Sequence, residues 1–379
     1  MKGKHARNAA GLERQRLRHA NPEQGLSQDA AANFPDPSQE LSLDSSASAG
    51  PRRALSKVAV KLVRRQVDNE SVFVFLYLIA MQLVGYALGV ILVTLYRWSQ
   101  SHVFSVERTA TSLNGWSLVV IYLVSTAVAF GFTIVYRRSQ VCDPGPYGVF
   151  HRSSRRMSAQ VAVSVVVLAL AAQAISRLYD LGVQTTIGRV GDSDFSALGI
   201  LSSPGFSLPL LLYSCLWGPV VEEVVFRGAI LSSLKRYGKL FAVLTSSFLF
   251  ALLHGNLMQG FFAFLLGLIL GFLGCEYSLI WPIFLHIGSN LAATYLPYLL
   301  VLSCKWWGLS PMGAVWGQRV FWLLVVVLAL VALYVNRRLL AGFRSSWDRA
   351  PNLYASWATP WFLLVCAIQI ALIIWRLYQ

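Results

Sequence analysis

Nine apolar runs follow one another along the chain, most of them near the ~20 residues that an α-helix needs to cross a lipid bilayer. Backbone polar groups find no water in the hydrocarbon core, so such runs satisfy them internally as helices. Hydrophobic residues fill 56% of the 379 positions, which excludes an ordinary soluble protein. We therefore expect an all-α, polytopic transmembrane helical bundle of about 8–9 spans. The runs cover 72–96, 116–136, 157–175, a segment starting near 208, 240–254, 257–277, 280–302, 320–335 and 361–375.

The positive charge is concentrated in the N-terminal tail and in short loops between the apolar runs. The formal net charge is +15 at pH 7. By the positive-inside rule, the basic loops and the N-terminus face the cytoplasm. We expect an integral, multi-pass protein of the cell (inner) membrane, with anionic lipid rather than nucleic acid as the partner of this charge. The basic clusters are Arg64/Arg65, Arg137/Arg138, Arg152/Arg155/Arg156, Lys235/Arg236/Lys239 and Arg337/Arg338/Arg344/Arg349.

Composition divides the chain into five segments. Residues 1–50 are basic and polar, with few aromatic or branched apolar residues, and are expected to form a disordered cytoplasmic tail. Residues 51–70 alternate basic and apolar positions at helical spacing, which predicts a basic amphipathic juxtamembrane helix; a solvated linker is the alternative. Residues 71–205 hold the N-terminal spans and an outward loop, 206–302 the catalytic core, and 303–379 the C-terminal spans.

Only a few ionisable side chains lie inside the apolar runs or at their ends. Charges at membrane depth cost ~2.5–3.5 kcal/mol each on insertion scales, so such residues usually have a function. The five scattered cysteines contain no C-x-x-C pair and indicate neither a disulfide framework nor a thiolate metal site. The embedded polar residues are Glu222, Glu223, Arg227, His254, His286 and Asn290.

Spacing separates the two adjacent carboxylates. Glu223 and Arg227 are four residues apart with the acid first, which favours an ion pair on one helix face. Glu222 points about 100° away and has no obvious cation beside it. Burial disfavours its charged form, which suits a general base. A purely structural lock remains the alternative for Glu223 and Arg227.

The two histidines come from different runs. His286 and Asn290 share a helix face and could supply the donors of an oxyanion hole. His254 could hold a water molecule together with Glu222. Each of these residues could instead make a hydrogen bond between helices without any catalytic role.

Three short motifs in this region resemble those of a known family. They are Glu222-Glu-Val-Val-Phe-Arg227, Phe250-Ala-Leu-Leu-His254 and His286-Ile-Gly-Ser-Asn290. Their order and types resemble the E-E-x-x-x-R, F-x-x-x-H and H-x-x-x-N motifs of the CPBP intramembrane proteases, also called the ABI or CAAX-protease-like family. The resemblance covers roughly residues 208–300, about a quarter of the chain.

The resemblance implies a peptidase that works within the bilayer. Relatives called type II CAAX prenyl endopeptidases remove a C-terminal tripeptide from prenylated proteins, while prokaryotic relatives process peptides or confer bacteriocin immunity. The substrate would be a peptide or a lipidated or prenylated protein, and no cofactor is required. Carried over by motif position, Glu222 activates a water held with His254, and the oxyanion donors are His286 and Asn290. Supporting roles fall to Glu223, Arg227 and Phe250.

Other readings of the same residues remain open. Glu222, His254 and His286 could form a His₂Glu zinc site of a membrane hydrolase, with a free position for water. The protein could also be a non-catalytic membrane scaffold or a bacteriocin-immunity protein that binds a peptide. A transporter finds little support, because neither inverted repeats nor acidic residues in several other runs are evident.

Overall fold

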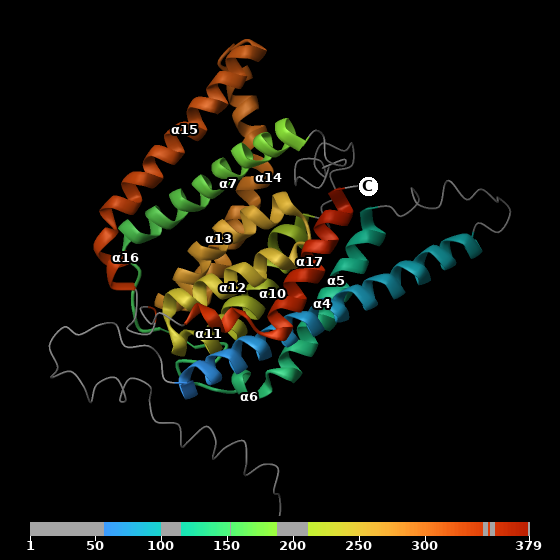
Figure 1. Ribbon diagram of the computed structural model, residues 1–379. Coiled ribbons are helices and arrows are strands. Elements are labelled where there is room, and N and C mark those ends of the chain that lie inside the picture. The colour runs from blue at the N-terminus through green and yellow to red at the C-terminus, as the bar shows by residue number, and fades with distance from the viewer. Residues whose placement is uncertain are drawn as a thin grey trace, which may run out of the picture. The chain divides into compact units, whose positions relative to one another are not determined.

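The computed structural model describes residues 57–99, 115–151, 153–187, 211–343, 348 and 353–377, which belong to the compact unit Ala54–Gln379. Within these ranges the chain forms helices and no strands (Figure 1). The expected all-α fold is therefore confirmed. The expected disordered tail, 1–50, lies outside the described residues, and the division into five segments stays a prediction.

Six of the described helices are long and apolar enough to cross a membrane, which confirms an integral membrane protein. They are α4 (Lys57–Ser99), α5 (Gly115–Tyr136), α7 (Ala159–Ile187), α13 (Leu257–Glu276), α14 (Ile280–Trp306) and α15 (Pro311–Val335).

The expected count of about 8–9 spans is only approximate, because α12 (Lys239–Leu253) and α17 (Pro360–Leu377) are shorter apolar helices. The 15 residues of α12 extend only ~22 Å at 1.5 Å each, less than the ~30 Å hydrocarbon core.

The run that contains the adjacent carboxylates is not one regular helix. It consists of η2 (Tyr213–Trp217), α10 (Gly218–Glu223), η3 (Val224–Leu231) and α11 (Ser232–Leu234), together called the site segment. Both η2 and η3 are π-helical. Pro219 lacks an N–H and its ring crowds the carbonyl four residues earlier, which explains the widened turn before it. Gly218 suits this turn, since a Cβ would make a tight contact, 3.2 Å, with the Tyr213 carbonyl oxygen.

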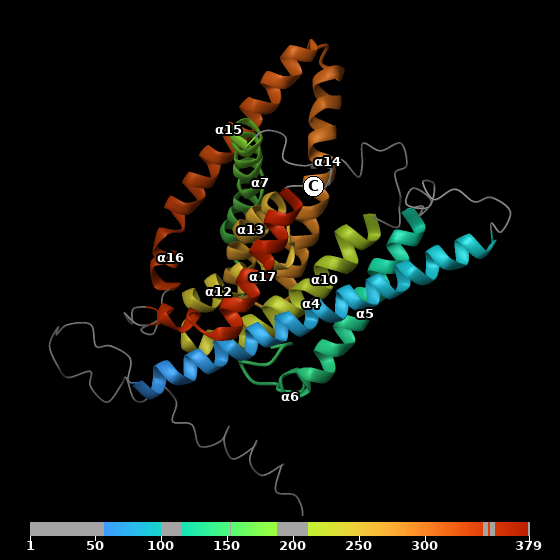
Figure 2. The same ribbon diagram turned by 45° about the vertical axis from the view of Figure 1, so that its right-hand side comes forward.

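The site segment lies in the middle of the bundle. Every residue of η3 is buried, and η3 packs against α12 and α13. Figure 2 shows α10 between α14 and α5, which it contacts. Helices α12 and α13 approach closely at Gly267 and Gly271, where a Cβ would lie 3.0 Å from Ser247 and 2.9 Å from Val243, respectively. Small residues therefore let α13 support the site segment at short range.

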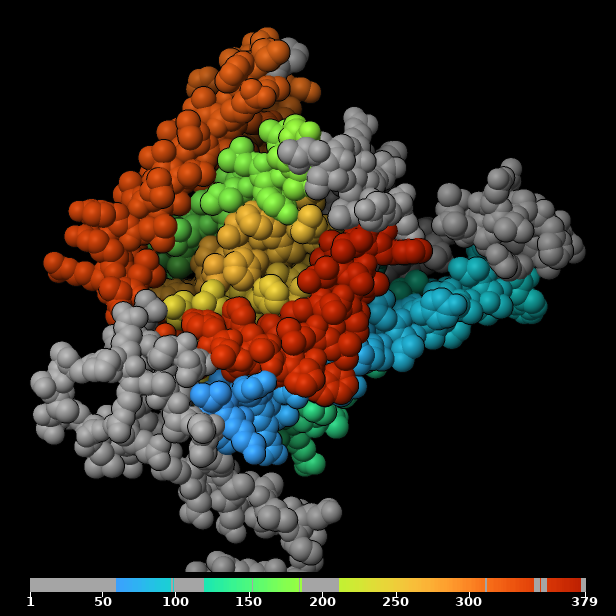
Figure 3. Space-filling view, viewed as in Figure 1, coloured from blue at the N-terminus to red at the C-terminus, as the bar shows by residue number. Residues whose placement is uncertain are grey.

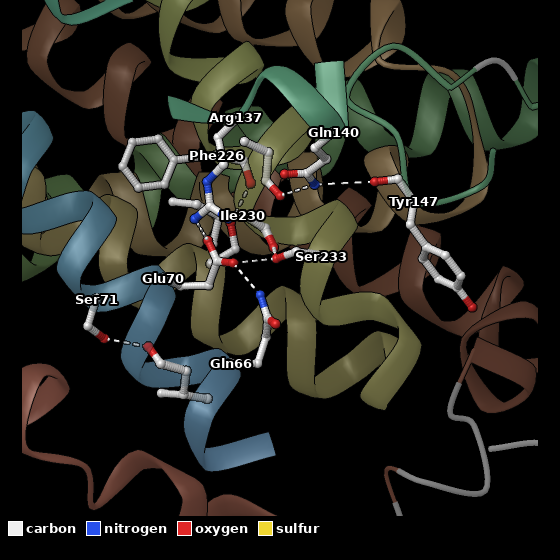
Figure 4. Close-up of polar contacts among 12 residues, drawn as sticks. Gln66, Glu70, Ser71, Arg137, Gln140, Tyr147, Phe226, Ile230 and Ser233 are labelled. Atoms are coloured by element: carbon white, nitrogen blue, oxygen red, sulfur yellow. Dashed lines mark hydrogen bonds and ion pairs between the residues drawn. The ribbon is translucent and has the colours of Figure 1, made fainter. Parts of the chain in front are cut away.

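A buried carboxylate joins α4 to the end of the site segment (Figure 4). Helix α4 runs unbroken from the basic residues into the first apolar run, and its Glu70 is 0% exposed. Glu70 accepts hydrogen bonds from Arg137, Ser233 and Gln66, each at 2.6 Å. Arg137 follows α5, and its guanidinium carbon also lies 4.5 Å from the centre of the Phe73 ring. The Glu70 carboxylate thus joins α4, the residue after α5 and the last part of the site segment.

The C-terminal helix closes the bundle against the start of α4. Figure 3 shows the red C-terminal segment lying along the blue first turns of α4. Arg64 donates to the Ala358 carbonyl at 2.7 Å. Asp68 accepts from the Trp361 backbone N–H at 3.0 Å, which satisfies one of the free N–H groups at the start of α17. This contact fixes the place of α17.

Candidate active site

Glu223 is fully buried and makes two polar contacts through one oxygen. Its Oε1 lies 2.8 Å from Arg227 Nη1 and 2.8 Å from His286 Nδ1. The ion pair expected from the four-residue spacing is therefore present. Both nitrogens point at the same oxygen, so the carboxylate of Glu223 orients a cation and an imidazole at once.

Arg227 is held from three sides. Its side chain is 0% exposed, and Nη2 donates to the Gly267 carbonyl at 3.4 Å. Its guanidinium carbon lies 4.5 Å from the centre of the Phe250 ring, a favourable cation–π distance. Breaking such a buried pair leaves an uncompensated charge, so the Glu223–Arg227 pair is a rigid support for the neighbouring residues.

Glu222 differs from its neighbour. Its side chain is 25% exposed, and its Oε2 lies 3.7 Å from His286 Nε2. Among the described residues, no group donates a hydrogen bond to Glu222 within ordinary hydrogen-bond distance. The structure therefore leaves Glu222 as the more accessible carboxylate of the two, as the spacing indicates.

His254 follows directly after α12, where the helix ends. Its Nδ1 lies 2.9 Å from the Phe250 carbonyl oxygen, which can only accept, so Nδ1 carries the proton. The neutral ring then presents Nε2 as an acceptor. Glu222 lies near enough to His254 for the two to interact electrostatically. A water molecule could be shared between them.

His286 is buried, and its two ring nitrogens face the two carboxylates. Nδ1 contacts Glu223 at 2.8 Å, while Nε2 faces Glu222 at 3.7 Å. Asn290, one turn further along α14, donates instead to the Ser214 carbonyl at 2.8 Å. The amide of Asn290 has a second N–H, which this contact leaves for another acceptor.

Phe250 is the aromatic centre of the site. It is 1% exposed, and its ring centre lies 5.0 Å from that of His254 and 5.7 Å from that of His286, both edge-on. The guanidinium of Arg227 lies over the face of the same ring. One phenyl ring therefore contacts residues from all three motifs, while its supporting role stays a prediction.

Three further residues near the site were not expected from the sequence. Tyr77 of α4 and Tyr213 of η2 lie within electrostatic range of Glu222. They come from other segments, and no periodicity links them to Glu222. The Gly267 carbonyl accepts a hydrogen bond from Arg227. The spacing of Gly267 and Gly271 indicates that two helices approach closely there, but it does not indicate that the Gly267 carbonyl is an acceptor.

The zinc alternative requires three ligands at one point. Among the described residues, no three histidine, cysteine or acidic side chains are grouped so that they could hold a metal ion. The Glu222, His254 and His286 set therefore does not fit a zinc ion as it stands. The cofactor expectation itself stays a prediction.

Comparison with known proteins supports the recognition based on the three motifs. Residues 204–292 match the family model of type II CAAX prenyl endopeptidase Rce1-like proteins. A candidate membrane peptidase, YdiL of Bacillus subtilis (strain 168), is 31% identical over 107 residues, which are 27% of this chain and 42% of that protein. The chain thus spans less than half the length of this relative, and no solved structure matches it. All three motifs fall within the matched residues 204–292, so this part of the chain is similar to type II CAAX prenyl endopeptidase Rce1-like proteins.

Proposed function

We propose that this chain is an intramembrane endopeptidase that hydrolyses a peptide bond with a water molecule activated by Glu222 and His254. The observation that carries the proposal is the difference in contacts and exposure between the two adjacent carboxylates. Glu223 is occupied by Arg227 and His286, whereas Glu222 is 25% exposed, faces the His286 imidazole at 3.7 Å and lies within electrostatic range of His254. An accessible carboxylate among fixed donors is suited to general-base catalysis.

In the proposed reaction, the water donates one hydrogen bond to Glu222 and one to His254 Nε2. Glu222 takes its proton as the oxygen attacks the scissile carbonyl, and a tetrahedral oxyanion forms. The second N–H of Asn290 and, in its doubly protonated form, the Nε2–H of His286 would donate to this oxyanion. Glu222 then returns the proton to the leaving amine as the C–N bond breaks.

The substrate class follows from the setting of the site. The bundle is embedded in lipid, and the matched family is named for prenyl endopeptidases. We propose a peptide or a lipidated or prenylated protein that reaches the site from the membrane. The basic loops support a cytoplasmic N-terminus in the cell (inner) membrane.

The test uses the purified full chain in proteoliposomes with a library of peptides, each with and without a C-terminal prenyl group. Glu222→Gln should lower the cleavage rate roughly 100- to 10,000-fold, the usual contribution of a general base. Its melting temperature should stay near that of the wild type, since Glu222 makes no close hydrogen bond among the described residues.

Glu223→Gln is the matched control, with the same change one residue away. It removes the buried charge that holds Arg227, so it should lower the melting temperature clearly. Cleavage that survives Glu222→Gln unchanged would refute the proposal. A wild-type chain that cleaves no peptide in the library but binds one would favour the scaffold or immunity reading. Loss of activity with chelator, together with one bound zinc per chain, would favour the metal reading.

A further inference from the structure

A polar hollow lies away from the catalytic residues, at the end of the bundle where basic residues of two loops meet. It has a volume of about 360 Å³ and lies between the start of α7, the α13–α14 turn and the turn from α15 into α16 (Arg337–Phe343). Three arginines line it: Arg155, Arg156 and Arg338. No carboxylate is among its lining residues, so the hollow is suited to an anion.

The positive charge of the hollow is only partly compensated. Arg155 pairs with Glu276, and the same carboxylate also binds Lys239 at 2.6 Å. Within the described part of the chain, Arg156 and Arg338 form no ion pair, and both are exposed. Two guanidinium groups are therefore available, and a guanidinium matches the oxygens of a phosphate in a bidentate geometry.

Side-chain hydrogen bonds join two helices at the floor of the hollow. Gln160 donates to Asn336 at 3.3 Å, and Asn336 in turn donates to Ser164 at 2.8 Å, so α7 and α15 are joined beneath the arginines. Helix α7 begins at Ala159, so the positive end of its dipole lies at the same point, while the Val161 N–H is already bound by the Ser158 hydroxyl at 3.3 Å. These features add to the attraction for an anion.

The remaining wall of the hollow is apolar. Tyr277, Val161, Val335 and Leu339 line it, and the Arg155 guanidinium lies 5.6 Å from the centre of the Tyr277 ring. A free inorganic ion would leave this wall without a partner, whereas a lipid has both a charged head group and an apolar body. Basic pockets of this kind between transmembrane helices bind anionic lipid head groups.

We propose that this hollow is a binding site for a phosphate group, carried by an anionic membrane lipid. The inference does not depend on the peptidase activity, because none of these residues belongs to the catalytic set. Arg156 and Arg338 bind the phosphate, and the more exposed Val335 and Leu339 contact the glycerol and the first methylenes of the acyl chains, while the buried Tyr277 and Val161 lie behind them.

The experiment uses the purified full chain in detergent, with bound lipid counted by native mass spectrometry. The probes are phosphatidylglycerol, phosphatidylcholine with the same acyl chains, and inorganic phosphate. We expect tight binding of phosphatidylglycerol alone, and an apparent affinity reduced about tenfold or more in Arg156→Gln/Arg338→Gln. Lys305→Gln/Arg319→Gln removes the same charge from exposed positions on α14 and α15, outside the basic clusters, and should leave that affinity nearly unchanged.

Three results would overturn the proposal. They are equal binding of the two lipids, equal weakening by the Lys305/Arg319 control, and competition by inorganic phosphate strong enough to make it the preferred ligand. If the double variant does not fold, Arg156→Gln and Arg338→Gln are measured singly, and each should weaken binding. Arg156→Lys/Arg338→Lys keeps both positive charges but removes the guanidinium groups. An affinity well below that of the wild type would support bidentate contacts. An affinity equal to that of the wild type would show that charge alone suffices and would contradict them.

Discussion

The buried Glu70–Arg137 pair offers the sharpest test of how the bundle is held together. Glu70 is 0% exposed and Arg137 is 13% exposed, and three donors converge on the carboxylate at 2.6 Å. Glu70→Ala removes every one of these acceptors and leaves Arg137 without its counter-charge. Removing one partner of a buried pair costs about 3–5 kcal/mol, so we expect a loss of stability of that size.

Glu70→Gln should cost less than Glu70→Ala. The amide keeps one oxygen for Arg137, and its nitrogen can face Ser233, whose hydroxyl can accept while donating to the Ile230 carbonyl 2.9 Å away. What is lost is the charge, and a hydrogen bond to a charged group is worth about 1.5–3 kcal/mol. The free energy of unfolding of Glu70→Gln should therefore lie between those of the wild type and Glu70→Ala.

The assay is equilibrium unfolding of the full chain in mixed micelles with increasing SDS at pH 7. Arg137→Ala alone should also be strongly destabilising, because it leaves the Glu70 carboxylate buried without a cation. The double variant Glu70→Ala/Arg137→Ala should lose less than the sum of the two single variants, by about 2 kcal/mol or more within the usual range of coupling energies. Arg65→Gln, an exposed change on the same helix, should stay within about 0.5 kcal/mol of the wild type. Strict additivity, or a loss under about 1 kcal/mol for Glu70→Ala, would refute the reasoning.

Two further changes test local structure next to the site. Asn256 accepts hydrogen bonds from the backbone N–H groups of Met258 at 2.9 Å and Gln259 at 3.1 Å. Asn256→Ala should therefore remove the cap of α13 and lower the free energy of unfolding by about 0.5–2 kcal/mol, while Asn256→Asp keeps the cap. A thermal melt of both variants decides this, and equal melts would show that the cap is unimportant. Gly238 has φ +131° before α12, and a Cβ there would collide with Asp348 Oδ1, so Gly238→Ala should cost about 1–3 kcal/mol. A melting temperature that is unchanged in Gly238→Ala would show that the loop relaxes freely.

Local spacing predicted the parts of the site that lie on one helix. The Glu223–Arg227 pair is a contact between residues four apart, and the structure contains it at 2.8 Å. The same rule places His286 and Asn290 on one face, but it does not say what they meet there. His286 contacts Glu223, while Asn290 donates to the Ser214 carbonyl. Side-chain partners on another element depend on packing, which spacing alone does not report.

The buried Glu70 shows where sequence patterns fail. It stands in a polar stretch before the first apolar run, where solvent exposure is the ordinary expectation. Its partner Arg137 is 67 residues away and was interpreted only as a charge that orients the chain in the membrane. The site segment is a second example, because an apolar run of sufficient length gives no sign of the π-helical turns around Pro219. Both features arise from contacts or backbone geometry that apolar periodicity does not encode.

The Phe250 ring has a consequence for how the three motifs can vary. Because one phenyl group contacts the guanidinium of Arg227 and both imidazoles, a change at any of these positions alters the surroundings of the other two. Substitutions at such positions are not energetically independent, so their effects on stability do not simply add. The three motifs therefore behave as one coupled unit, in which a replacement tolerated beside one partner is not tolerated beside another.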